Sequence, residues 1–63
     1  MTQKELLYVE DAIKHENNMI GILNETIGLL EDENLISFIE SELKKHCSFV
    51  DKLTSFLGGY ANE

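Results

Sequence analysis

The chain has 63 residues, a formal charge of −7 and 43% hydrophobic residues, which indicates one small acidic domain. A domain of this size buries a small share of its surface, so disulfides, a metal or self-association usually completes it. The single cysteine, Cys47, cannot form a disulfide within the chain. Twelve acidic residues against five basic ones repel phosphate backbones and anionic lipids. We therefore expect no nucleic-acid partner. The apolar runs are too short for a membrane span or a secretory signal, so we also expect no membrane insertion, and the cytoplasm as the compartment.

The first predicted helix covers residues 3–30. Thr2 followed three residues later by Glu5 forms a capping box, in which each side chain can accept from the backbone amide of the other. After this start, residues at alternating steps of three and four are apolar with one exception, Glu16. This spacing keeps one face of a helix against a partner helix. The predicted seam of the first helix is Leu6, Val9, Ile13, Glu16, Ile20, Leu23, Ile27 and Leu30.

An acidic turn over residues 31–34 separates the first helix from a second predicted helix over residues 35–57. The carboxylates and the amide of the turn are suited to capping the amides of the helix that follows. Gly58 and Gly59 predict the end of the second helix, with residues 58–63 as a short tail. The predicted seam of the second helix is Ile36, Ile39, Leu43, His46, Val50, Leu53 and Leu57, with Leu35, Phe49 and Phe56 beside it.

The predicted fold is all-α: an antiparallel two-helix hairpin that dimerises into a four-helix bundle, because two helices cannot enclose a core. Ile22 and Leu29 form a second apolar strip with Tyr8. Beside that strip lie Gly21 and Gly28, and a mid-helix glycine costs about 1 kcal/mol relative to alanine. Either another helix approaches closely there, or the two glycines are tolerated surface residues.

Glu16 and His46 interrupt otherwise apolar seams, and a buried ionisable group needs a partner. Counting back from the turn places the two at nearby levels, so we expect them to contact each other within the hairpin or across a dimer. One hypothesis is a polar pair that sets helix register and oligomeric state. A second is a metal site in the dimer core formed by Glu16, His46 and Glu42, one turn before the histidine. A third is that one or both groups reach solvent.

Several segments together resemble the repeating hairpin of the spore coat F family, a ferritin-like group. They are residues 8–16, the acidic turn, residues 42–46 and residues 57–60. The resemblance implies half of a ferritin-like bundle from a spore-forming bacterium, with a coat-associated role. It also matches Glu16 and His46 to ferritin-like ligands for iron or manganese. Leu43 stands where that pattern has a carboxylate, which argues against oxidative di-iron chemistry.

The leading functional hypothesis is a non-enzymatic structural or protein-interaction module, with no cofactor and with itself as the first partner. The chain shows no combination of serine, histidine and acid, no phosphate loop and no cysteine with a positioned base. Two alternatives stay open. One is a ferritin-like homodimer that binds iron or manganese at an incomplete site, and the other is a small helical regulator that docks on a signalling protein.

Overall fold

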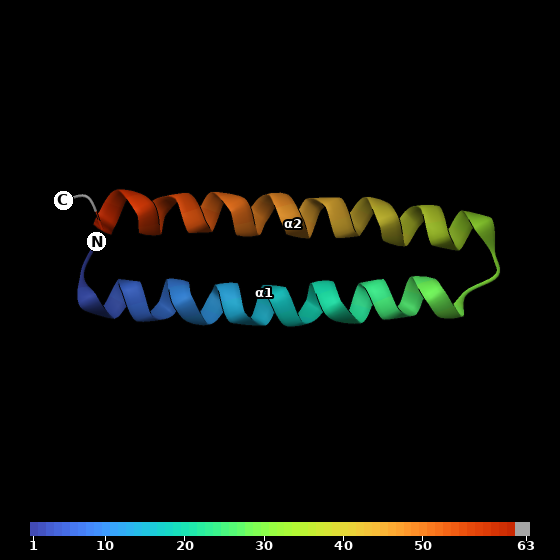
Figure 1. The fold of residues 1–63 in the computed structure, drawn as a ribbon, viewed down its shortest axis with the longest axis horizontal. Coiled ribbons are helices and arrows are strands. Elements are labelled where there is room, and N and C mark those ends of the chain that lie inside the picture. Colours follow the sequence, from blue (N-terminus) through green and yellow to red (C-terminus); the bar gives the residue numbers. More distant parts are fainter. Residues whose placement is uncertain (62–63) are drawn as a thin grey trace.

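The computed structural model describes residues 1–61 and consists there of two helices, α1 (Gln3–Leu29) and α2 (Glu33–Ala61). The helices lie side by side and antiparallel, and the short loop between them puts the start of α1 and the end of α2 at the same end of the hairpin (Figure 1). The hairpin measures 47 × 14 × 11 Å. The predicted all-α hairpin is therefore confirmed, and within the described residues there is no strand.

The start of α1 is the capping box that the sequence predicts. The Glu5 amide donates to the Thr2 hydroxyl over 3.0 Å, and the Thr2 amide donates to the Glu5 carboxylate over 2.8 Å. The bond from the Thr2 amide to the ionised carboxylate is the largest cause that lowers the pKa of Glu5, and the Thr2 side chain lowers this pKa further.

The start of α2 is capped by Asp32, as the acidic turn predicts. One carboxylate oxygen of Asp32 accepts from the amides of Asn34 and Leu35, over 2.9 and 3.0 Å. These are two of the amides that have no partner within the helix. The chain therefore reverses direction and begins a new helix within a few residues.

The two seams lie where the 3–4 spacing places them. Every predicted seam residue, from Leu6 to Leu57, is half-buried. No residue from 1 to 59 is fully buried. Two packed helices can cover each seam from one side only, so the hairpin has a line of contacts and no enclosed core.

The predicted end of α2 at Gly58 and Gly59 is wrong, because the helix continues to Ala61. A glycine ends a helix by adopting a positive φ, and neither of these glycines does so. Both therefore stay in the helix, at the cost of mid-helix glycine. The last two residues of the expected tail, Asn62 and Glu63, lie outside the described residues.

The hairpin has two different broad faces beside its seam. Apart from Thr26, whose equivalent Phe56 is exposed, every half-buried position in α1 between 6 and 27 recurs 30 residues later in α2. A half-turn about an axis perpendicular to the broad faces therefore roughly exchanges the helices. Equivalent positions in the two helices then lie on the same broad face. One face, which we name the apolar flank, consists of two rows of residues. The inner row holds the residues that directly precede every second seam residue. The outer row, which we call the margin, holds residues that follow members of the inner row by three positions. The members of the apolar flank are Glu5, Ala12, Met19, Thr26, Leu35, Glu42, Phe49 and Phe56, with the margin Tyr8, His15, Ile22, Leu29, Phe38, Lys45 and Lys52.

The opposite face, which we name the polar flank, is exposed and mostly polar. It carries Glu10, Asn17, Asn24, Glu40, Cys47 and Thr54. On the apolar flank, in contrast, Ala12, Thr26 and Glu42 are half-buried. The hydroxyl of Thr26 donates to the carbonyl of Ile22 over 2.8 Å, so its polar atom already has a partner. The hairpin thus presents one face suited to packing and one suited to water.

Candidate functional site

Glu16 and His46 meet in the middle of the hairpin. The Oε2 atom of Glu16, on α1, contacts the Nδ1 atom of His46, on α2. When Glu16 is ionised, the imidazole donates its Nδ1–H to the carboxylate. The side chains are 22% exposed for Glu16 and 31% for His46. The contact that the sequence allowed either within the hairpin or across a dimer therefore forms within one chain.

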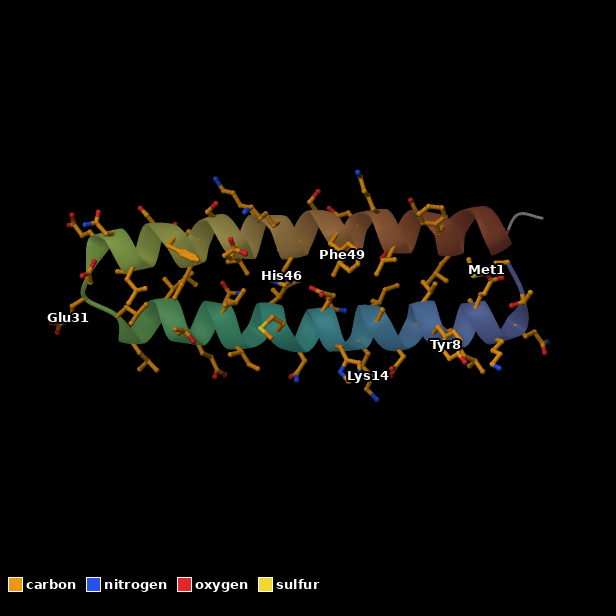
Figure 2. All side chains as sticks on the ribbon, turned by 180° about the vertical axis from the view of Figure 1, so that it is seen from behind. Met1, Tyr8, Lys14, Glu31, His46 and Phe49 are labelled. Atoms are coloured by element: carbon orange, nitrogen blue, oxygen red, sulfur yellow. The ribbon has the colours of Figure 1, made fainter. Side chains whose placement is uncertain are left out.

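The pair helps to line a shallow hollow of about 160 Å³, whose lining residues are Glu16, Lys45, His46 and Phe49. Lys45 and Phe49 belong to the apolar flank, so the hollow opens on that face. Figure 2 shows His46 and Phe49 on the side of α2 that faces α1, whereas Tyr8 and Lys14 project from the outer side of α1. A protein that covered the apolar flank would therefore also cover the polar pair.

Glu42 does not join Glu16 and His46 in a metal-binding group. Its carboxylate accepts from the Lys45 ammonium over 3.2 Å, in an ion pair between residues three apart on α2. Within residues 1–61 of a single chain, no three His, Cys, Asp or Glu side chains are close enough to hold a metal ion. The three predicted ligands are thus divided between two pairs, Glu16 with His46 and Glu42 with Lys45.

Besides Glu16 and His46, the residues predicted for dimer contacts or register fall into two groups. Ile22, Leu29, Phe49 and Phe56 are exposed and lie on the apolar flank. Gly21 and Gly28 do not belong to the apolar flank. Each directly precedes a margin residue in the sequence, but lies on the side of α1 toward the polar flank. A Cβ atom built at either glycine would meet nothing within 4 Å. The hairpin by itself therefore has no close approach that requires these glycines.

Lys45 is a lining residue of the hollow that was not among the predicted site residues. A signal was available, because Lys45 follows Glu42 by three residues, the spacing at which side chains on a helix face one another. His15 makes a similar exposed pair, with its Nε2 atom 3.4 Å from the Asp11 carboxylate. Exposed pairs of this kind contribute little to stability. The pair of Glu42 and Lys45 is relevant because Lys45 lines the hollow.

Neither helix, within the part of the chain that the structure describes, has an apolar stretch long enough to cross a membrane. Comparisons of the chain with protein family models, with curated proteins and with solved structures find no match.

Proposed function

We propose that this chain is a non-enzymatic protein-interaction module, a helical hairpin that works by packing against a second helical hairpin, in the first instance its own copy. The observation that carries the proposal is the absence of a core. None of residues 1–59 is buried, whereas large apolar side chains are exposed along the hairpin. They include Leu7, Tyr8, Met19, Ile22, Leu29, Leu35, Phe38, Phe49 and Phe56, with exposed fractions from 41% to 84%.

The surface area supports self-association. A compact chain of 7.2 kDa is expected to expose about 4,100 Å², and this hairpin exposes 4976 Å². A compact dimer of twice the mass would expose about 6,800 Å², so that closing it would bury about 3,000 Å² in total. That area exceeds the roughly 1,600 Å² of a standard specific interface and is in the range of obligate homodimers.

The polar pair supports a binding role more than a chemical one. The four residues that line the hollow supply a carboxylate, an imidazole, an ammonium and an aromatic ring, but no hydroxyl or thiol nucleophile. A single polar contact in an otherwise apolar helix interface can set register and partner choice. We assign Glu16 and His46 this role.

The resemblance to the spore coat F family would place such a module in a spore, as a coat-associated protein. This part of the proposal depends on the residues that carry the resemblance. Detection of the chain in purified spores, against its level in vegetative cells of the same strain, would test it. Equal or greater abundance in vegetative cells would argue against a coat role.

Sedimentation equilibrium over a hundredfold range of concentration tests the module itself. We expect the mass of a dimer, twice 7.2 kDa, with dissociation only at the lowest concentrations. A folded hairpin that stays monomeric throughout would refute self-association as the function.

Metal binding, for which the contact between Glu16 and His46 is the supporting observation, is the second candidate. Two such pairs in a dimer would bring four ligand-type side chains together. Elemental analysis after expression with added iron and manganese tests it on the same sample. A dimer with one or two ions per pair of chains, lost in both Glu16→Ala and His46→Ala, is the expected result for a metal protein. A metal-free dimer contradicts this candidate.

A further inference from the structure

We infer that a second copy of this chain packs on the apolar flank with its loop at the same end, so that each α1 lies over the α2 of the other copy. The inference rests on the proposed self-association and adds the face and the arrangement. Two arrangements of a pair of hairpins make all neighbouring helices antiparallel. The first is the inferred one, with both loops at the same end. In the second, the loops lie at opposite ends, so that α1 packs on α1 and α2 packs on α2.

The sizes of the facing side chains favour loops at the same end. The contact between Glu16 and His46 sets the levels along the hairpin, and a two-fold axis parallel to the helices keeps every residue at its level. Ala12 of one copy then lies near the level of Phe49 of the other, and Thr26 near that of Leu35. A small residue thus meets a large one on both sides of the axis, as close packing of a core requires.

Loops at opposite ends would produce uneven packing. The two-fold axis would then cross the middle of the hairpin, near the level of Glu16 and His46. Phe56 of one copy would face Leu35 of the other, while Ala12 would face Met19. The facing pair on the two α2 helices would be larger than the facing pair on the two α1 helices, so that one spacing between the hairpins would not suit both.

Charge favours the same choice. In the opposite-end arrangement Lys45 lies within two residues of the level of its own symmetry mate, so that like charges approach each other across the interface. In the same-end arrangement each Lys45 lies over α1 of the other copy, so the two Lys45 side chains do not face each other. Juxtaposed like charges at an interface select against an arrangement.

A matched pair of substitutions on α2 tests the face. Phe49, which is 48% exposed, belongs to the apolar flank, and Thr54, also exposed, belongs to the polar flank. We expect Phe49→Asp to raise the dimer dissociation constant at least about a hundredfold, because each dimer loses two aromatic anchors and gains two charges. Thr54→Asp introduces the same charge on the same helix and is expected to change the constant less than about threefold. Equal effects of the two substitutions would overturn the assignment of the face.

A single spin label in the loop tests the arrangement, and it does so on a dimer that folds. The label is attached at Glu31→Cys in a Cys47→Ser background, and the distance between labels is measured by pulsed electron resonance. Loops at the same end predict roughly 10–25 Å, set by the spacing of neighbouring helices and the length of the labels. Loops at opposite ends predict a separation close to the 47 Å length of the hairpin.

The outcomes separate the two proposals. A short distance in a dimer supports the inference. A distance near the length of the hairpin overturns the arrangement and leaves the interaction module standing. A labelled chain that is monomeric at every concentration, like its unlabelled parent, overturns both.

Discussion

At the scale of single residues, the contact between Glu16 and His46 is the feature that distinguishes this hairpin from two plain apolar seams. Both side chains are less than one-third exposed, so each has lost much of its hydration. A polar group in that position is costly when it has no partner and close to neutral when it is paired. The contact therefore penalises any shift of one helix along the other, since a shift would separate the two groups.

Removing one member of the pair should lower the free energy of unfolding more than removing the remaining member afterwards. We expect Glu16→Ala and His46→Ala each to destabilise by about 1–2 kcal/mol, and the double variant to show a coupling of about 1 kcal/mol. Glu16→Leu combined with His46→Leu should be at least as stable as the parent, because the seam becomes continuously apolar. Urea unfolding at one fixed protein concentration measures all four. Strictly additive costs would show that the contact does not couple the helices.

The capping box predicts a pH dependence at the start of α1. The pKa of Glu5 is lowered in the folded chain by its hydrogen bonds with Thr2, so the stabilisation is complete above the ordinary glutamate pKa, about 4.3. It is lost as the pH falls through the lowered pKa, because protonation removes the acceptor. Amide exchange in the first turn should therefore speed up at acid pH. Glu5→Gln should exchange at a rate independent of this titration, and an unchanged acid response in that variant would assign the effect to another group.

At the scale of the elements, each helix begins at a side-chain cap, and the cap of α2 also closes the loop. Asp32 supplies the oxygen that two amides of α2 share. Asp32→Ala should lower stability by about 1 kcal/mol, or roughly 4–8 °C in melting temperature for a chain of this size. Asp32→Ser should retain most of the stability that the cap contributes, because serine is also a favourable N-cap residue. Glu31→Ala, one residue away, is the control, and a loss equal to that of Asp32→Ala would mean that loop charge matters and the cap does not.

The glycines of α1 offer a test of which surface is covered. Gly21 and Gly28 face open space in the hairpin, and they lie away from the apolar flank. Alanine at either position should stabilise by roughly 0.5–1 kcal/mol through helix propensity, with no change in the dimer dissociation constant. Thermal unfolding and sedimentation measure the two effects. A weakened dimer would instead show that another helix approaches these glycines closely.

At the scale of the whole molecule, we expect the stability of the folded hairpin to depend on its self-association. A hairpin with no buried residue among residues 1–59 has little to hold it folded alone, since a domain of this size is marginal even when compact. The melting temperature should therefore rise with protein concentration, as it does when association stabilises the folded state. Phe49→Asp should flatten that rise, while Thr54→Asp should preserve it. A melting temperature independent of concentration in the parent chain would mean that the hairpin is stable by itself.

Much of the fold was predictable because it depends on local spacing. The capping box, the acidic cap of α2 and both seams are patterns within one or two helical turns, and the structure confirms each of them. The end of α2 was not predictable from Gly58 and Gly59, because a glycine permits a left-handed turn without requiring one. Similarly, the spacing of Glu42 and Lys45 allowed the ion pair, but also allowed a contact between Glu42 and His46 one turn away.

The amino-acid sequence by itself therefore determined where the helices form, which residues make up each seam, and that one polar residue interrupts each seam. These properties follow from helical periodicity and capping, which act over a few residues. Only the tertiary structure decided that Glu16 meets His46 within a single chain, that Glu42 turns to Lys45, and that the exposed aromatic residues gather on one broad face. Those outcomes depend on the register and direction of one helix against another. Register is set by the loop and by contacts between the helices, such as that of Glu16 with His46, 30 residues apart.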